Sequence, residues 1–326
     1  MKIAVIGAGA IGGWVAARLA LAGNNVSVLA RGETLRALQE GLTIREDGTA
    51  RKAIVRASSD SAGLGQQDLL VIAVKAPALA DVARRIDPML GPRTIVLPML
   101  NGVPWWFLDG EPLLSVDPDG RIAAALPMER VVGSVVHAAC RRIAPGSIEV
   151  IHADRLVLGE PHGATSQRVE RLAALCGGAG IHAEASDNVR RDIWYKLWGN
   201  MTMNPVSALT LATADRILAD ELLRPFILDC MAEAAAIGGA IGCPIGESGE
   251  ERMAVTARLG AFKTSMLQDV EAGRKIELEA LIGAPREIAR RVGIPAPNID
   301  LLYALTRLMA ESRGLLEDPG PSDGPA

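Results

Sequence analysis

The sequence predicts an α/β fold, with a doubly wound sheet followed by an all-α domain. Three observations lead to this prediction. A glycine-rich turn follows a short apolar segment at the N-terminus, apolar and helical segments alternate through the first half, and helical, alanine-rich periodicity begins at Asp187. We therefore predict domains of residues 1–186 and 187–313. Residues 314–326 form a tail, expected to be disordered because Asp318–Ala326 lacks an apolar anchor.

The glycine-rich turn lies between a predicted strand, Lys2–Ile6, and a predicted helix, Trp14–Ala22. In this context the first glycine permits a tight turn, the second lets the backbone approach a pyrophosphate, and the third lets helix and strand pack closely. The N-terminus of the helix faces the phosphates with its partial positive charge. The turn, Gly7-Ala8-Gly9-Ala10-Ile11-Gly12, therefore predicts a Rossmann-like dinucleotide site, the alternative being a glycine-rich turn without a ligand.

Arg31 follows the second predicted strand, Asn25–Ala30, where a site for NAD usually carries Asp or Glu to hold the ribose 2′-hydroxyl group. An arginine can pair with a 2′-phosphate, which a carboxylate would repel. The predicted cofactor is therefore NADPH. Two alternatives stay open: Arg31 could be a solvated loop residue, and Glu33 lies near enough to keep NAD as a candidate.

The composition argues against several classes of function. A net charge of −4, a pI of about 5.7 and scattered Lys and Arg give no reason to expect a nucleic acid or a membrane as partner. No apolar stretch reaches the ~20 residues of a membrane span, and a signal peptide has no room before the first strand, so we expect a cytoplasmic protein. Four scattered cysteines and four scattered histidines suggest neither a metal site nor a disulfide framework.

Further elements of the first domain continue the alternation. They are a helix at Thr34–Gln39, a hairpin turn at Glu46-Asp47-Gly48, buried strands at Asp68–Val74 and Thr94–Met99, and a loop at Phe107–Arg121. More strands, expected to be antiparallel with a turn at Pro145-Gly146, are predicted at Val131–Ala139, Ser147–Ile151 and Leu156–Leu158.

The second domain is predicted to be helical. Its candidate helices are Asn188–Met203, Glu221–Ile241, Ser248–Ala272, Ile276–Val292 and Pro297–Ser312. The apolar helix at Glu221–Ile241 suits either the core or a dimer face, so a homodimer stays open.

Polar residues follow predicted strands of the first domain, where a doubly wound sheet binds its ligands. Lys75 and Asn101 each stand directly after a buried strand, and His137 lies near the end of the strand Val131–Ala139. Each is also compatible with a solvated strand end.

Lys196, Asn200 and Asn204 form an i, i+4, i+8 stripe on the first helix of the second domain. A lysine on such a stripe can protonate a developing alkoxide, and the amides can hold a substrate's polar groups. Pro205 predicts that the helix ends or kinks at Asn204. The alternative is a solvated helix face. A separate stripe of the same helix has core spacing: Trp194, Leu197, Trp198 and Met201.

Glu277 is a second candidate, because it shares an apolar helix face with Leu281, Ala284 and Ile288. A carboxylate on such a face has either a partner or a function. Ser265 and Asp269 form an i, i+4 pair, which is equally typical of an ordinary surface.

These residues resemble the landmarks of the ketopantoate reductase (2-dehydropantoate 2-reductase) family, from Met1 to about Leu308. The landmarks are GAGAIGG at Gly7, Arg31, VKA at Val74, NGV at Asn101, HAA at His137, KLWGNMTMNP at Lys196, and SMLQD at Ser265 followed by Glu277. The resemblance implies reduction of 2-dehydropantoate to pantoate with NADPH. It also implies a Rossmann domain, a helical domain and an active site in the cleft between them.

The resemblance implies roles for individual residues. Lys196 resembles the catalytic general acid and Glu277 its acidic partner, and both would contact the substrate. Asn200, Asn204 and Ser265 match substrate-binding positions. Cofactor-binding positions are matched by Gly7, Ala8, Gly9, Ala10, Ile11, Gly12, Arg31, Lys75, Asn101 and Ala139, of which Asn101 could touch both ligands.

One departure from the family pattern concerns the substrate. Ala214 stands where the family commonly has a substrate-binding asparagine. The catalytic pair is therefore better defined than the substrate, and a different branched 2-keto acid is an alternative. An oxidative dehydrogenase acting on another acid and an NADPH-binding regulatory protein without catalysis are further alternatives. The physiological pathway stays open.

Overall fold

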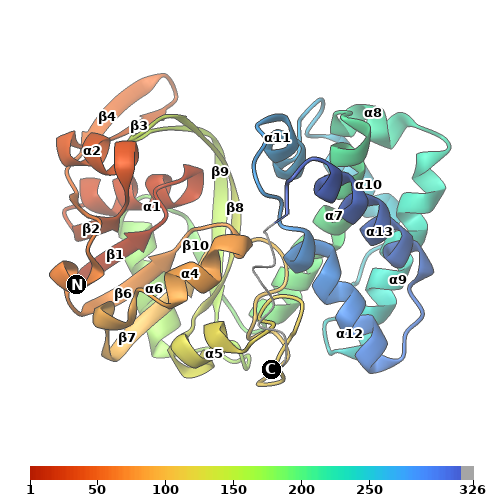
Figure 1. The fold of residues 1–326 in the computed structure, drawn as a ribbon, viewed down its shortest axis with the longest axis horizontal. Coiled ribbons are helices and arrows are strands. Elements are labelled where there is room, and N and C mark those ends of the chain that lie inside the picture. Colours follow the sequence, from red (N-terminus) through yellow and green to blue (C-terminus); the bar gives the residue numbers. More distant parts are fainter. Residues whose placement is uncertain (317–326) are drawn as a thin grey trace, which may run out of the picture. The chain divides into compact units, whose positions relative to one another are not determined.

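The structure is a computed structural model that describes residues 1–316 (Figure 1). The chain divides into two compact units, Met1–Ile193 and Trp194–Ala326. The division falls inside a helix, later in the chain than the boundary predicted at Ser186. Each unit is described by itself below. The segment Asp318–Ala326, predicted to be disordered, lies outside the described residues.

A five-stranded parallel sheet forms the centre of the first unit, in the order β5-β2-β1-β6-β7. Ile3 to Ile6 of the central strand are almost completely buried, as expected for a strand covered on both faces. This arrangement confirms the predicted doubly wound sheet. The strands are β1 (Lys2–Ile6), β2 (Asn25–Leu29), β5 (Arg56–Ser58), β6 (Gln67–Ile72) and β7 (Leu90–Pro98); the intervening helices are α1 (Ala10–Leu21), α2 (Gly32–Glu40), α3 (Ser61–Leu64), η1 (Ala76–Ala78), α4 (Leu79–Ala83) and η2 (Asp87–Met89).

A second, mixed sheet completes the strands of this unit. Its strands are β3 (Leu42–Glu46), β4 (Thr49–Ala53), β8 (Gly133–Ala144), β9 (Ser147–Gly159) and β10 (Ala183–Ser186), in the order β10-β9-β3-β4 with β8 paired to β9. Asp47 and Gly48 both have left-handed φ angles, 48° and 75°, which confirms the predicted tight hairpin between β3 and β4.

The predicted separation of Ser147–Ile151 from Leu156–Leu158 is wrong, because both belong to β9. The intervening residues His152 to Asp154 are exposed, so their polarity imitates a break in the strand. They still lie opposite β8, with irregular register next to Ala139. The antiparallel pairing of β8 with β9 is as predicted, whereas β10 pairs with β9 in parallel.

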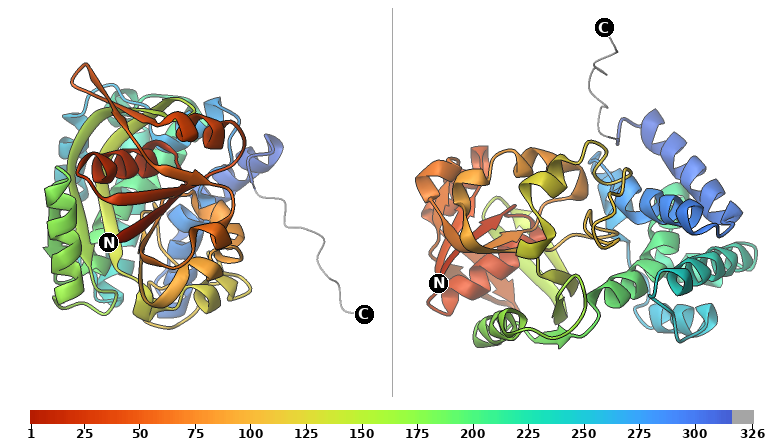
Figure 2. Two further views of the ribbon diagram at one scale, coloured as in Figure 1. Left: turned by 90° about the vertical axis from the view of Figure 1, so that its left-hand side faces the viewer. Right: turned by 90° about the horizontal axis from the view of Figure 1, so that it is seen from below.

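Helix α1 lies between the two sheets of the first unit (Figure 2, left). It contacts β1 and β2 of the parallel sheet and β3, β4, β8 and β9 of the mixed sheet. The residues from Gly12 to Ala17 are buried, and Trp14 is only 2 % exposed. Helix α1 is therefore apolar around most of its circumference, as a helix covered on several sides must be.

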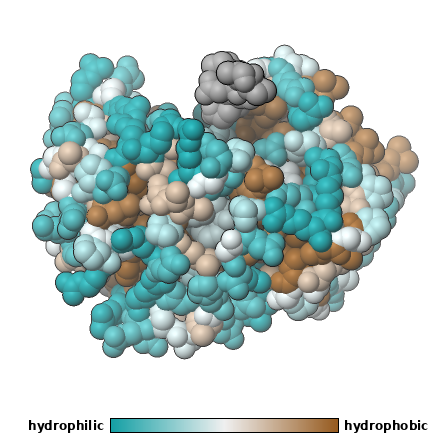
Figure 3. Space-filling model, turned by 60° about the horizontal axis from the view of Figure 1, so that its bottom comes forward, coloured by the Kyte–Doolittle hydropathy of each residue, from teal (hydrophilic) through white to brown (hydrophobic). Residues whose placement is uncertain are grey.

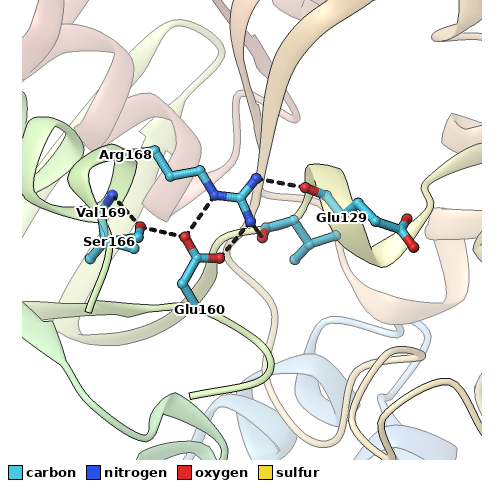
Figure 4. Close-up of polar contacts among 6 residues, drawn as sticks. Glu129, Glu160, Ser166, Arg168 and Val169 are labelled. Atoms are coloured by element: carbon cyan, nitrogen blue, oxygen red, sulfur yellow. Dashed lines mark hydrogen bonds and ion pairs between the residues drawn. The ribbon is translucent and has the colours of Figure 1, made fainter. Parts of the chain in front are cut away.

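Arg168 joins three segments of the first unit (Figure 4). It lies on α6 (Gln167–Gly178), and its guanidinium donates to both carboxylate oxygens of Glu160, at 2.7 and 2.5 Å. It also donates to the carbonyl oxygens of Glu129, at 2.6 Å, and Val131, at 3.0 Å. The hydroxyl of Ser166 donates to Glu160 as well. This network ties α6 to the segments that precede β8 and follow β9, near the short helices α5 (Arg121–Ala125) and η3 (Met128–Arg130).

The elements of the second unit are helical throughout its described residues. They are α7 (Val189–Thr210, which begins in the first unit), α8 (Ala214–Ala219), α9 (Leu223–Ala240), α10 (Gly249–Ala257), α11 (Ser265–Glu271), the π-turn η4 (Glu279–Gly283), α12 (Ala284–Val292) and α13 (Pro297–Ser312). The ring N–H groups of Trp194 and Trp198 donate to the carbonyls of Ala234, at 3.1 Å, and Met231, at 2.8 Å. These bonds join α7 to α9 and confirm the core face predicted for the tryptophans.

Two helix boundaries differ from the prediction. Helix α7 does not end at Asn204 but runs through Pro205 to Thr210, and the residues on both sides of Pro205 are buried, so packing offsets the lost backbone hydrogen bond. The predicted helix Ser248–Ala272 is two helices, because Gly260 takes a left-handed φ of 68° and Thr264 caps the start of α11.

The surface carries several separate apolar areas among hydrophilic side chains (Figure 3). Leu301, Leu305 and Leu308 on α13 are each about half exposed. On α9, Ile227, Met231, Ala234 and Ile237 are buried, so this face belongs to the core of the second unit. Within residues 1–316, no helix is long and apolar enough to cross a membrane.

Replacing Arg168 tests the network around Glu160. Burial by itself would raise the pKa of Glu160, but the hydrogen bonds from Arg168 and Ser166 and the charge of Arg168 lower the pKa below its ordinary value. This stabilisation is present above the unfolded pKa of about 4.3 and is lost as pH falls through the lower folded value. We expect Arg168→Leu to lower the free energy of unfolding by about 2 kcal/mol at pH 7.

Urea denaturation of both proteins between pH 7 and pH 3 measures this effect, and the difference should shrink below pH ~4. Arg171→Leu is the control, because Arg171 is on the same helix and donates to the exposed Gln167. An equal loss in the control, or a difference that does not change with pH, would contradict the prediction.

Candidate active site

The glycine turn brings the start of α1 against β1 and the residues after β6. Gly7 has a left-handed φ of 95°, and a Cβ there would lie 2.6 Å from the carbonyl oxygen of Ala73. A Cβ on Gly12 would lie 2.0 Å from the carbonyl oxygen of Gly7. Both glycines are therefore required by the fold itself.

Gly9 differs from these two glycines. Its φ is −77°, and a Cβ at this position would meet nothing within 4 Å. The fold therefore does not require a glycine here, and the open space lies at the N-cap of α1, where no side chain caps the helix. Free backbone N–H groups facing open space suit an anionic group such as a pyrophosphate.

A cavity of about 350 Å³ lies at this turn within the first unit. Gly7, Ala8, Gly9 and Arg31 belong to its lining, as expected from the sequence. Three further charged residues that the sequence did not single out also line it: Asp81 and Arg85 near α4, and Arg142 on β8. Arg31 pairs with Asp81 at 3.5 Å, and Asp81 also pairs with Arg84 at 2.7 Å. With three arginines and one carboxylate in its lining, the cavity suits an anion with more than one negative charge.

The other predicted cofactor residues lie outside the lining of this cavity. Lys75 is half-buried and stands before η1, and Asn101 is half-buried just after β7. The backbone N–H of Ala73 donates to Ile6 and that of Met99 donates to Ile72, so the carboxyl ends of β1, β6 and β7 lie in register. The structure thus brings Lys75 and Asn101 to the same edge of the sheet as the glycine turn. Ala139 is exposed on β8 of the other sheet.

Lys196 lies on α7, beside the core face formed by the tryptophans. Its side chain is half-buried, as is that of Asn200, while Asn204 is 5 % exposed. Burial lowers the pKa of Lys196, the negative charge of Glu277 partly offsets this effect, and the resulting pKa is about 8. A lysine of this kind is largely protonated at neutral pH and can release its proton more readily than an ordinary lysine.

Glu277 is buried, at 8 % exposed, but it does not lie within a regular α-helix. Helical structure begins at Leu278 and passes through the π-turn η4 before α12. The predicted start of this helix at Ile276 is therefore wrong, and the π-turn changes the angular spacing between Glu277 and the buried residues Ala284 and Ile288. Pro285 explains this turn, since a proline inside a helix removes a hydrogen bond and clashes with the carbonyl four residues earlier. The charge of Glu277 nevertheless reaches Lys196.

The remaining candidates of the second unit have different surroundings. Ser265 is the exposed first residue of α11, whereas Asp269 is 6 % exposed and pairs with Arg274 at 3.0 Å. Asp269 thus has a structural partner. Ala214 is fully buried, and its backbone N–H donates to the carbonyl of Phe262 at 3.0 Å. The structure therefore places Ala214 against the segment that leads to Ser265.

Within residues 1–316, no group of His, Cys, Asp and Glu side chains is arranged to hold a metal ion. Three of the four cysteines are also poor nucleophiles. Burial raises the pKa of Cys140 and Cys230 to about 12 and that of Cys176 to about 11.

Two family models match the chain. The model described as "Ketopantoate reductase PanE/ApbA" matches residues 3–163, and the model described as "Ketopantoate reductase PanE/ApbA C terminal" matches residues 188–310. Together they cover most of both units.

Known proteins agree with these matches. A 2-dehydropantoate 2-reductase of Mesorhizobium japonicum is 45% identical, over 96% of this chain and 99% of that protein. A crystal structure of a candidate ketopantoate reductase from Ralstonia solanacearum has a TM-score of 0.93 and 55% identity, covering 96% of this chain and 99% of that one. A D-mandelate dehydrogenase with NADH and anilino(oxo)acetate shares the fold, with a TM-score of 0.84 at 21% identity over 97% of this chain and 100% of that one.

Alanine substitutions can separate the two kinds of glycine in the turn. We expect Gly9→Ala to keep the thermal unfolding midpoint within a few degrees, and to weaken dinucleotide binding on the order of tenfold by filling the space that a pyrophosphate needs. Gly12→Ala should instead lower the free energy of unfolding by about 3 kcal/mol, because the new Cβ overlaps Gly7.

Fluorescence titration with NADPH and thermal unfolding of each variant measure the two effects. Gly239→Ala on α9 is the control, because a Cβ there also meets nothing within 4 Å and the residue belongs to the second unit. Unchanged NADPH affinity in Gly9→Ala would show that no ligand approaches at Gly9.

Proposed function

The chain belongs to the ketopantoate reductase family, and on that basis we propose that it reduces 2-dehydropantoate to pantoate with NADPH. It is an oxidoreductase, and members of this family act on small keto acids with a nicotinamide cofactor. The observation that carries the proposal is the environment of Lys196, in which burial lowers its pKa and the charge of Glu277 partly offsets this, giving a pKa of about 8. A ketone becomes an alcohol only if its oxygen receives a proton, and this lysine is suited to donate it.

NADPH is favoured over NADH by the charges of the cavity at the glycine turn. Arg31 stands where a carboxylate would hold the ribose of NAD, and Arg85 and Arg142 add two positive charges to the same lining. Asp81 is the opposing charge: its Oδ1 pairs with Arg84 at 2.7 Å, and its Oδ2 makes a longer contact of 3.5 Å with Arg31. The balance of charge supports a site for a 2′-phosphate.

Different residues of the protein have different roles in the reaction. When bound, NADPH supplies the hydride that reduces the keto carbon. Lys196 donates a proton from Nζ to the keto oxygen, and its positive charge stabilises the negative charge that develops there. Glu277 keeps Lys196 charged and oriented. The amides of Asn200 and Asn204 and the hydroxyl of Ser265 bind polar groups of the substrate.

The remaining candidate residues bind the cofactor. The backbone N–H groups at Gly9 and the start of α1 hold the pyrophosphate, and Arg31 holds the 2′-phosphate. Lys75, Asn101 and Ala139 complete the cofactor contacts, and Asn101 also contacts the substrate.

A panel of 2-keto acids provides the first test of the proposed function. Turnover is measured by the loss of NADPH absorbance. We expect 2-dehydropantoate to give a higher kcat/KM than pyruvate and several branched 2-keto acids. Each acid is assayed with NADPH and with NADH, and NADPH should give the higher kcat/KM. Faster turnover of another acid would assign a different substrate to the protein. It would also point to the region of Ala214 as the source of that difference. Tight NADPH binding without any turnover would support a regulatory protein, and equal rates with both cofactors would contradict the role of Arg31.

The pH dependence of kcat/KM tests the role of Lys196. Because the protonated lysine is the active form, the rate should fall as pH rises above about 8. Glu277→Gln removes a charge that raises the pKa of Lys196, so the fall should begin at a lower pH.

Lys196→Ala should lose roughly 100- to 10,000-fold in kcat and keep its NADPH dissociation constant. If Lys196→Ala lost NADPH affinity and turnover to the same extent, the role as proton donor would be excluded.

A further inference from the structure

The backbone that carries Glu277 is irregular, so neighbouring elements must fix its direction. The segment between the end of α11 at Glu271 and the start of helix at Leu278 has no regular secondary structure beyond a turn. Only after Glu277 does the helical ladder begin, with the N–H of Leu281 donating to the Glu277 carbonyl at 3.2 Å. The direction of the Glu277 carboxylate is thus not set by a continuous helix.

The residues just after α13 hold this segment on the N-terminal side of Glu277. The N–H of Ile276 donates to the carbonyl of Leu315 at 3.0 Å. The ammonium group of Lys275 donates to the carbonyl of Gly314 at 3.2 Å and to that of Leu316. Leu315 is only 2 % exposed, and its own N–H donates back to Ala310 of α13 at 2.8 Å. These residues, predicted from sequence to lie in a disordered tail, are therefore packed in place, which corrects that prediction for 314–316.

Helix α13 itself holds the segment on the C-terminal side. The hydroxyl of Tyr303 donates to the carboxylate of Glu279, two residues after Glu277, at 2.7 Å. The guanidinium of Arg286 lies 3.9 Å from the centre of the Tyr303 ring and pairs with Asp300 at 2.5 Å. Burial raises the pKa of Glu279. The charges of Arg286 and Arg307 oppose this rise, and the charge of Glu287 reinforces it. Tyr303 therefore ties α13 to Glu279, the first residue of the π-turn.

We propose that Tyr303 and Gly314–Leu316, here called the α13 brace, position the Glu277 carboxylate toward Lys196. The brace touches the chain at Ile276 and at Glu279, one residue before and two residues after Glu277. This inference rests on the proposed function, in which Glu277 keeps Lys196 charged and oriented. Tyr303 and Leu315 are positioning residues, since they act on Lys196 only through Glu277.

Releasing the brace lets Glu277 move, and a displacement of about 1 Å at a catalytic group can cost up to roughly 100-fold in rate. It also weakens the charge that raises the pKa of Lys196. A merely structural role would lower stability without changing that pKa. The pKa of Lys196 is therefore the measurement that distinguishes positioning from general stabilisation.

The experiment compares two shortened chains. A chain ending at Arg313 lacks Gly314–Leu316, whereas a chain ending at Leu316 keeps the whole brace and serves as its control. Tyr303→Phe removes one hydroxyl while keeping the ring beneath Arg286, and Ser312→Ala, which removes the hydroxyl that donates to Leu308 on the same helix, is its control. For each protein, kcat is measured against pH, the NADPH dissociation constant is titrated, and the pKa of Lys196 is followed by NMR of labelled lysine side chains.

We expect the chain ending at Arg313 to lose roughly 10- to 100-fold in kcat, with a lower pKa for Lys196 and an unchanged NADPH dissociation constant. Tyr303→Phe should show a smaller change in the same direction, and both controls should match the full chain. The proposal would be overturned if the pKa of Lys196 in both test variants equalled that in the full chain. It would also be overturned if the chain ending at Leu316 showed the same changes in kcat and pKa as the chain ending at Arg313. If the chain ending at Arg313 does not fold, Tyr303→Phe decides alone. If the full chain reduces no keto acid, the proposed function fails, while the NMR measurement still tests the brace.

Discussion

The approach of Gly12 to the carbonyl of Gly7 is the constraint on which the first unit depends. This contact lets α1 start directly above β1, and it leaves no room for any side chain. Helix α1 is in turn enclosed by the parallel sheet and the mixed sheet, so its axis is fixed by packing on several sides. The open space at Gly9 and the uncapped N-terminus of α1 are consequences of this placement, and packing of the core holds both in place.

In the second unit, two opposing effects set the pKa of Lys196. Lys196 is held on a helix whose core face is anchored by two tryptophan hydrogen bonds, and its burial disfavours the charged form. Glu277 favours the charged form. Burial alone would lower the pKa of Lys196 further, and the charge of Glu277 limits that fall. The pKa of about 8 is the balance of these two opposing effects.

Local signals were sufficient for much of the fold and for part of the site. The glycine turn, the Asp47-Gly48 hairpin and the tryptophan stripe each depend on a few adjacent residues, and the structure has all three as predicted. The continuation of α7 through Pro205 could not be foreseen, since it depends on burial by distant helices that outweighs a local penalty. Arg142 could not be assigned to the cavity for a similar reason: it lies on the mixed sheet, far along the chain from the turn that it faces.

The contacts of Gly314–Leu316 have a consequence for synthesis of the chain. Domains generally fold in order from the N-terminus as the ribosome makes them. The first unit ends at Ile193, so the residues that line the cavity at the glycine turn are all translated before those of the second unit. Lys275, by contrast, bonds to carbonyls that lie 39 and 41 residues further along the chain, and the N–H of Ile276 bonds to Leu315 in the same segment. The segment that carries Glu277 can therefore be secured only after the residues that line the cavity have been made.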